Sequence, residues 1–335
     1  MTRATLAALL LLAALQATAQ DSPARLAETL AEARSLIDSG NPKSAIARLE
    51  ALEPKDDPRV RQLLGVALYR ADQCLPAIER LEPLATAFPD GSLERREVVQ
   101  VLGLCRYLSG QLREAIPLLE KTREWAGDSL ELQHALAMAY IQTQQPESAR
   151  AAVARIFGVP AESPQARLLT AQLMIRAQLD DLAEAELRQA LAADKELPHA
   201  RFLLGQTALF RGRVDEALAL LSDELKLNPG DAMTHYRLGD VFLHRQDWDR
   251  AIESLQRSIW LNPFFSGPYI LLGRAYMQKG ELATAEGMLR QAIAYDPNNS
   301  VGHYMLGQLL QRLGRREEAQ RELELADRLK DSPGR

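Results

Sequence analysis

The chain has 335 residues, of which 47% are hydrophobic and 25% are charged, with 40 Lys and Arg, 45 Asp and Glu, and two Cys. The net charge of −5 argues against a nucleic-acid-binding protein, which needs a basic field, and two cysteines exclude a Cys-rich zinc site. Acidic and basic residues are interspersed rather than blocked, which is typical of solvated helix surfaces.

Residues 1–19 are predicted to be a secretory signal peptide. Arg3 is followed by an apolar run from Leu6 to Leu15 and then by Ala17-Thr18-Ala19, so we expect cleavage after Ala19. A run of that length makes about 15 Å of helix, which is too short for a bilayer core of about 30 Å. With its Ala-, Leu- and Arg-rich composition, the chain looks like an exported bacterial protein. We expect a periplasmic location, with secretion beyond the outer membrane as the alternative.

After a short segment, 20–25, the chain repeats itself. Pro229, Pro263 and Pro297 each end a similar tripeptide, which is Leu-Asn-Pro twice and Tyr-Asp-Pro once, and they recur every 34 residues. A fixed period of this size indicates one supersecondary unit that is copied and stacked. With these prolines at position 32, the units cover 26–333, leave 334–335 as a tail, and start at residues 26, 58, 96, 130, 164, 198, 232, 266 and 300.

Three columns of the repeat confirm this register. Position 8 is always Gly or Ala, and position 24 is Leu in every unit except one, which has Val. Position 20 is alanine in all nine units: Ala45, Ala77, Ala115, Ala149, Ala183, Ala217, Ala251, Ala285 and Ala319. Apolar positions 7 and 11 mark one helix and positions 20, 24 and 27 a second. The small residues at positions 8 and 20 are expected to let two helices approach closely. Position 15 is often Gly, which suits a left-handed helix end, and the proline ends the second helix. The sequence therefore predicts an all-α protein of stacked helical hairpins.

This pattern resembles the tetratricopeptide repeat family. The match consists of Leu at position 7, Gly or Ala at 8, Tyr at 11 in two units (Tyr140 and Tyr276), Ala at 20 and Pro at 32, over about nine-tenths of the chain. The resemblance implies a solenoid, a right-handed superhelix of about nine hairpins that runs through the whole repeat region. The Trp that the family has at position 4 is replaced here by His235, Tyr269 and His303.

The family consists mostly of protein-binding scaffolds, in which the first helix of each unit lines a concave groove, chiefly through positions 2, 5, 9, 12 and 13. The resemblance therefore implies a partner protein or peptide in that groove. The residues expected to line it are Tyr69, Tyr107, His134, Arg176, Phe202, Phe210, Tyr236, His244, Arg274 and Tyr304. Among these, we expect Phe202, Phe210 and Tyr236 to form one aromatic patch. Similar exported proteins serve in polysaccharide export and outer-membrane biogenesis, so a cell-envelope assembly is the expected setting.

The sequence contains none of the common catalytic or phosphate-binding motifs. H-E-x-x-H, G-x-S-x-G, G-x-x-x-x-G-K-[ST] and G-x-G-x-x-G are all absent, and the five histidines are spread over four units. We therefore expect no catalytic residues, no cofactor, no metal site and no enzymatic activity. The alternative is an accessory subunit of an envelope enzyme, or an enzyme that uses residues outside known motifs.

Cys74 and Cys105 allow two interpretations. They fall at position 17 of the second unit and position 10 of the third, which places them toward the same end of helices expected to be adjacent, about one helical turn apart. In an oxidising compartment they can form a disulfide. Alternatively, they are two small buried hydrophobic side chains.

Overall fold

The computed structural model describes residues 23–52, 56–127 and 129–331. Within these ranges the chain forms eighteen α-helices and no β-strand, which confirms the predicted all-α class. The predicted signal peptide at 1–19, the first part of the 20–25 segment and the tail at 334–335 lie outside the described residues. None of the helices described is long and apolar enough to cross a membrane.

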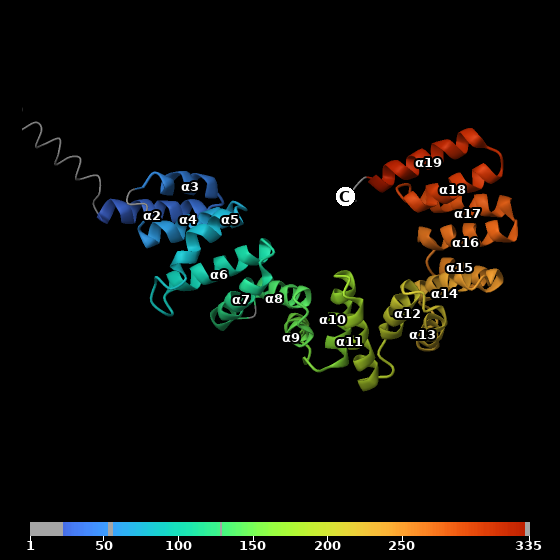
Figure 1. Cartoon of the computed structure of the whole chain (residues 1–335), viewed down its shortest axis with the longest axis horizontal. Coiled ribbons are helices and arrows are strands. Elements are labelled where there is room, and N and C mark those ends of the chain that lie inside the picture. The colour runs from blue at the N-terminus through green and yellow to red at the C-terminus, as the bar shows by residue number, and fades with distance from the viewer. Residues whose placement is uncertain (1–22, 53–55, 128, 332–335) are drawn as a thin grey trace, which may run out of the picture. The chain divides into compact units, whose positions relative to one another are not determined.

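Successive helices pair into nine hairpins that correspond to the nine predicted repeats (Figure 1). The chain divides into two compact units, Met1–Glu162 and Ser163–Arg335. The first unit holds α2 (Pro23–Asp38), α3 (Pro42–Glu50), α4 (Pro58–Arg70), α5 (Cys74–Leu81), the 3-10 turn η2 (Glu82–Leu84), α6 (Leu93–Leu108), α7 (Leu112–Ala126), α8 (Leu130–Gln142) and α9 (Pro146–Phe157). The second unit holds α10 (Pro164–Arg176), α11 (Asp180–Ala193), α12 (Ala200–Phe210), α13 (Val214–Leu227), α14 (Ala232–His244), α15 (Trp248–Leu261), α16 (Ser266–Lys279), α17 (Leu282–Tyr295), α18 (Ser300–Arg312) and α19 (Arg316–Asp331). One solenoid running through all nine hairpins stays a prediction.

Each hairpin is closed by a close approach of its two helices. A Cβ added to Gly239 of α14 would lie 2.5 Å from Cγ of Leu255 on α15, so any larger residue there would force a neighbouring group to shift. The same contact between positions 8 and 24 recurs in four other hairpins, at Gly65 with Leu81, Gly205 with Leu221, Gly273 with Leu289, and Gly307 with Leu323. All nine alanines of position 20 are at most 1% exposed. The interpretation of the small residue at position 8 as a helix contact is therefore confirmed.

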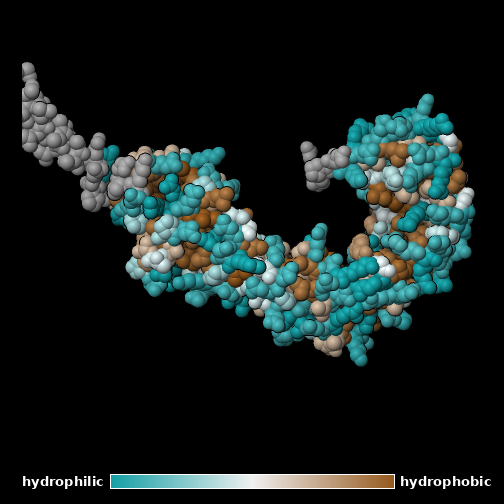
Figure 2. Space-filling model, in the orientation of Figure 1, coloured by the Kyte–Doolittle hydropathy of each residue, from teal (hydrophilic) through white to brown (hydrophobic). Residues whose placement is uncertain are grey.

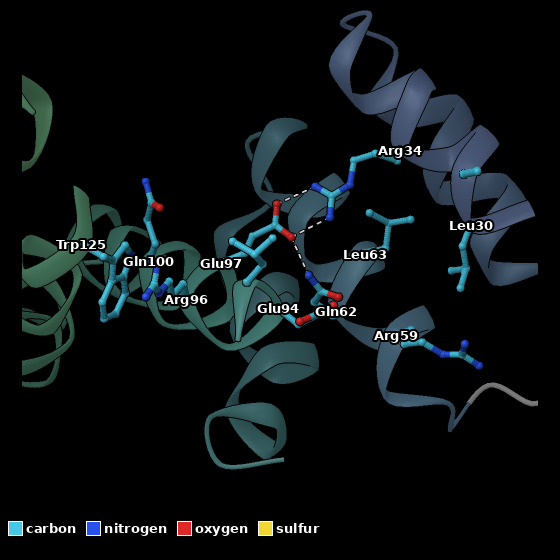
Figure 3. Close-up of a pocket in the computed structure, with 12 residues that line it drawn as sticks. Leu30, Arg34, Arg59, Gln62, Leu63, Glu94, Arg96, Glu97, Gln100 and Trp125 are labelled. Atoms are coloured by element: carbon cyan, nitrogen blue, oxygen red, sulfur yellow. Dashed lines mark hydrogen bonds and ion pairs between the residues drawn. The ribbon is translucent and has the colours of Figure 1, made fainter. Parts of the chain in front are cut away.

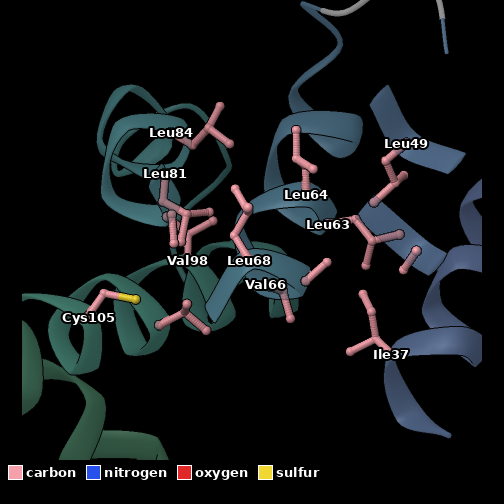
Figure 4. Packing of buried hydrophobic residues seen from close by; sticks show 14 of the residues in the cluster. Ile37, Leu49, Leu63, Leu64, Val66, Leu68, Leu81, Leu84, Val98 and Cys105 are labelled. Atoms are coloured by element: carbon pink, nitrogen blue, oxygen red, sulfur yellow. The ribbon is translucent and has the colours of Figure 1, made fainter. Parts of the chain in front are cut away.

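Stacked hairpins share a hydrophobic core. In the first unit the core extends from α2 to α6 and includes Leu49, Leu68, Leu81 and Val98, all buried (Figure 4). The cluster draws on several hairpins, so the burial of these side chains depends on the neighbouring hairpin. The face of each unit that Figure 2 shows is mostly hydrophilic, with hydrophobic patches among the hydrophilic atoms.

All nine hairpins end their first helix with a left-handed residue at position 15. Five of these residues are glycine, as the sequence predicted, with φ from 72° to 80°: Gly40, Gly110, Gly212, Gly280 and Gly314. The other four have side chains and adopt φ from 58° to 60°: Asp72, Gln144, Gln178 and Gln246. A side chain with a Cβ disfavours this backbone conformation, so these four turns carry strain.

Replacing Gln246 by glycine is expected to stabilise the protein by about 0.5–1 kcal/mol. The left-handed strain of about 1–2 kcal/mol is relieved, and the greater freedom of glycine in the unfolded chain cancels part of that gain. Urea denaturation followed by circular dichroism measures the change. The reciprocal change, Gly280→Gln, should destabilise by a similar amount, and a loss of stability in Gln246→Gly would contradict the strain argument.

Repeat position 4, where the family's Trp is replaced by His or Tyr, has a consistent role in three hairpins of the second unit. The His235 ring lies 3.2 Å from the carbonyl oxygen of Pro229, and the Tyr269 hydroxyl donates to the carbonyl of Pro263 at 3.0 Å. The His303 ring faces the carbonyl of Pro297 in the same way at 3.0 Å. In each case a polar ring satisfies the carbonyl of the proline in the preceding loop, which fixes the entry to the first helix.

Ion pairs join second helices of successive hairpins. Glu184 of α11 accepts from Arg188 at 2.7 Å and from Arg213 at 2.6 Å, and both arginines also reach Glu216 of α13. The same four repeat positions, 21, 25, 16 and 19, form a second network between α17 and α19, at Glu286, Arg290, Arg315 and Glu318. Because the Arg213 guanidinium donates to it, the pKa of Glu184 falls from its usual 4.5 to about 2.

Stability is expected to fall as the pH drops from about 4.5 toward 2. The pKa of Glu184 is lower in the folded state than in the unfolded state, so its contribution is complete above the unfolded value and is lost as the carboxylate protonates. Glu184→Gln should therefore be less stable at neutral pH and lose less on acidification. Urea midpoints at intervals of pH test this. The exposed Glu253 of α15 supplies the control substitution. If the urea midpoint of Glu253→Gln depended as little on pH as that of Glu184→Gln, the assignment to the network would be contradicted.

Candidate partner-binding surfaces

The first helices of the hairpins form a shared layer within each unit. In the first unit α2, α4, α6 and α8 contact one another in series, and in the second unit α12, α14, α16 and α18 do the same. No contact of comparable extent joins successive second helices in the described part of the chain. The layer of first helices therefore carries the surface that the family resemblance assigns to a partner.

A cavity of about 700 Å³ opens on this layer in the first unit (Figure 3). Its floor is formed by Glu97 of α6, which accepts two hydrogen bonds from Arg34 of α2, at 2.5 and 2.7 Å, and one from Gln62 of α4, at 2.5 Å. This hydrogen bonding raises the pKa of Arg34, so the guanidinium is firmly charged. One carboxylate thus connects three successive first helices.

The far side of the cavity is lined by Trp125 at the end of α7, with the Arg96 guanidinium 5.8 Å from its ring centre. Leu93 stands at the start of α6 with 77% of its surface exposed. The sequence prediction named none of Arg34, Glu97 and Trp125. Arg34 and Glu97 do fall at groove positions 9 and 2 of their units, so the repeat register could have found them, whereas Trp125 lies at position 30, outside the family's pattern.

The other predicted residues of the first unit lie apart from this cavity. Tyr69 and Tyr107 are half-buried, and burial raises the pKa of both hydroxyls. His134 of α8 is exposed. None of these three side chains lines the 700 Å³ cavity.

The predicted aromatic patch of the second unit has a different composition in the structure. Phe202 is only 4% exposed, and its ring stacks on that of His199 at 4.6 Å between centres. The prediction that Phe202 faces a partner is therefore wrong. The backbone explains this, because His199 adopts a left-handed conformation just before α12 and brings its ring over the first turn.

Phe210 and Tyr236 are instead connected by an arginine that the sequence analysis passed over. The Arg237 guanidinium lies 5.6 Å from the ring centre of Phe210 and 5.1 Å from that of Tyr236. Phe265 meets Tyr236 edge to face at 5.0 Å. We call Phe210, Tyr236, Arg237 and Phe265 the arginine–aromatic cluster. Phe210, 74% exposed, is its accessible member.

The remaining predicted residues lie on first helices of the second unit. Arg176 of α10 and His244 of α14 are exposed, and the His244 ring is 3.8 Å from the carboxylate of Asp240. Arg274 of α16 is half-exposed. Tyr304 of α18 is 48% exposed, and its hydroxyl accepts from Gln308 at 2.8 Å.

The two cysteines are neighbours. Cys74 at the start of α5 is half-buried and lies near Cys105 of α6, which is fully buried in the core of the first unit. Both are free thiols in this structure. Burial raises the pKa of Cys105 above its usual value, and the neighbouring Cys74 thiol adds to the effect.

Sequence comparison with known families fits this architecture. Two family models, both described as tetratricopeptide repeat, match the sequence, one over residues 202–264 and the other over residues 107–173 and 276–332. Together the matches cover more than half of the chain. The chain is a tetratricopeptide repeat protein. It therefore has the architecture of a protein–protein interaction scaffold, and the family prediction is confirmed.

Several solved structures are similar to parts of the chain. MamA from Desulfovibrio magneticus RS-1 (residues 41 to the end) is 23% identical, with a TM-score of 0.45 over 50% of this chain and 97% of that one. YrrB, described as a TPR protein with an unusual peptide-binding site, is 21% identical, with a TM-score of 0.42 over 50% of this chain and 87% of that one. The Cut9–Hcn1 hetero-tetramer of APC/C is 17% identical, with a TM-score of 0.46 over 84% of this chain and 55% of that one. A comparison with curated proteins found no match.

Proposed function

We propose that this repeat protein is a non-catalytic scaffold of the periplasm that holds a partner protein or peptide on its first-helix layer. The arginine–aromatic cluster is the observation that carries the proposal. Interfaces are enriched in Tyr, Phe, Trp and Arg at their energetic centres, and Phe210 is exposed beside an arginine and a tyrosine on contacting helices. Covering an exposed phenylalanine removes a large apolar surface from water, which favours binding.

The setting that we propose is a cell-envelope assembly, such as one for polysaccharide export or outer-membrane biogenesis. The leader-like segment from Arg3 to Ala19 supports export. N-terminal sequencing of the protein recovered from the periplasm tests this part separately. A chain that starts at Gln20 is the expected result, whereas an intact leader on cytoplasmic protein would contradict it.

The binding test replaces the accessible ring of the cluster. Phe210→Ala should weaken capture of the partner from envelope extract by about 30-fold, because truncation of a central aromatic anchor costs about 2 kcal/mol. Phe202→Ala is unsuitable, since Phe202 belongs to the core. Helicity by circular dichroism should be unchanged.

Trp260 provides the matched control. It lies on the second helix α15, is 70% exposed and is packed against an arginine, Arg257, at 4.2 Å. Trp260→Ala therefore removes a comparable exposed ring from the other layer and should leave capture unchanged. Equal loss in both variants, or undiminished capture by Phe210→Ala, would remove the proposed surface.

A further inference from the structure

Charge is segregated between the two sets of helices in the second unit. The second helices α11, α13, α15, α17 and α19 carry seventeen Asp and Glu against nine Lys and Arg. The first helices carry a single carboxylate, Asp240. Against it stand seven cations: Arg167, Arg176, Arg201, Arg237, Arg274, Lys279 and Arg312. In a chain with a net charge of −5, this layer is locally positive.

Most of these cations form no ion pair with a carboxylate of the described residues. Arg167 pairs with Glu186 and Lys279 with Asp249. Among the described residues, no carboxylate lies within ion-pair distance of the other five, whereas the arginines of the second helices α11 and α17 are held in networks. The surface positive charge of the layer is therefore available to a ligand.

Two of the arginines also have buried donors without acceptors. The Nε–H of Arg237 is buried and makes no hydrogen bond while its guanidinium lies against the rings of Phe210 and Tyr236. One terminal nitrogen of Arg201, on the contacting helix α12, is also buried and unpaired. Buried polar groups are nearly always paired, so both arginines retain unused hydrogen-bond donor capacity.

The arrangement places the charges on successive helices in contact. Arg237 belongs to α14, Arg274 to α16 and Arg312 to α18, and these helices contact one another in series. The Arg237 site combines a cation with the exposed ring of Phe210, so it suits an apolar side chain flanked by a carboxylate. Arg274 and Arg312 continue the positive surface away from it.

We infer that the second unit binds an acidic peptide segment that carries an aromatic residue, with the aromatic side chain against Phe210 and carboxylates on Arg237, Arg274 and Arg312. The inference rests on the proposed scaffold function and specifies the chemistry of its partner. The net charge of −5 and the acidic second helices disfavour the long polyphosphate backbone of a nucleic acid more than a short peptide that stays within the layer.

Fluorescence anisotropy with labelled peptides tests the inference on the full chain. The probe is a twelve-residue peptide of Asp and Glu with one central Phe, and the comparison peptide has Asn and Gln in their place. The acidic peptide is expected to bind about tenfold or more tightly than its neutral analogue at low salt, and to weaken as salt is added. Equal affinity of the two peptides would overturn the inference.

The charge variants locate the effect. Arg274→Gln with Arg312→Gln should weaken the acidic peptide by about tenfold. The control removes two exposed cations from the second helix α19, Arg316→Gln with Arg321→Gln, and should change affinity by less than about twofold. Equal losses in both pairs would show a general field effect and would overturn the site.

Two further outcomes separate the inference from the scaffold proposal. If the neutral peptide binds as well as the acidic one and both need Phe210, the scaffold stands and the acidic preference fails. If a twelve-nucleotide oligothymidine binds more tightly than the acidic peptide and loses affinity in Arg274→Gln with Arg312→Gln, the layer is a nucleic-acid surface and the inference fails. Binding of the acidic peptide alone, through Phe210 and these arginines, supports both.

Discussion

Oxidation with a low-molecular-weight disulfide such as oxidised glutathione is expected to join Cys74 to Cys105 and to raise the free energy of unfolding by about 3–4 kcal/mol. The two thiols lie near each other on adjacent helices, and a disulfide between them would close a loop of about 30 residues between α5 and α6. Each thiol loses its hydrogen, and the reagent is reduced to two glutathione thiols. The new bond would tie the second hairpin to the third.

The expected route begins at the more accessible sulfur. Cys74 is half-buried and can form the mixed disulfide, which Cys105 then displaces. Because burial raises the pKa of Cys105, the second step should be slow at neutral pH and faster as the pH rises. Intact-mass analysis after alkylation, with and without reductant, measures the product.

Cys74→Ser is the control for the effect on stability. It keeps the size of the side chain but cannot be cross-linked, so oxidant should leave its urea midpoint unchanged. Two thiols that remain alkylatable after oxidation of the native sequence, with no gain in stability, would leave the pair as packing residues. This would favour the second interpretation of the sequence.

The contact between positions 8 and 24 is expected to give the largest losses of stability. Leu255 is fully buried between α14 and α15, so Leu255→Ala should cost about 2–5 kcal/mol through the cavity that it leaves. Gly239→Ala should cost about 1–3 kcal/mol, because its Cβ would lie 2.5 Å from Cγ of Leu255 and would force that buried side chain or its helix to shift.

The double variant distinguishes this contact from two independent losses. In Gly239→Ala with Leu255→Ala, the added methyl occupies part of the space that the leucine vacated. Its cost should therefore be smaller than the sum of the single costs. Urea denaturation of the four proteins gives the coupling free energy. Strict additivity would show that the two residues do not press on each other.

Much of the fold follows from the period of the sequence. Ala251 at position 20 and Gly239 at position 8 were identified as a helix contact because a column of small residues has little other use than to let two helices approach. Gly280 at the end of α16 was likewise expected to be left-handed. The same strained turn at Gln246 could have been inferred from the repeat register, although residue type gave no sign of it.

The site was less predictable. Phe202 and Phe210 lie on the same short helix at groove positions, yet one is 4% exposed and the other 74%. The difference depends on His199, whose left-handed backbone carries its ring onto Phe202. No spacing rule reports such a contact, because it depends on the path of one loop.

The sequence by itself determined the hairpin, its period, its small-residue contact and its left-handed turn, because each depends on residues within one 34-residue unit. It also determined the net charge of each helix, since that charge is the sum of the charges of its residues. Only the tertiary structure decided which side chains meet between hairpins: Glu97 with Arg34 and Gln62, and Arg237 with Phe210. These contacts depend on the angle and offset at which successive hairpins pack, and that geometry is fixed jointly by two surfaces rather than by the pattern of either.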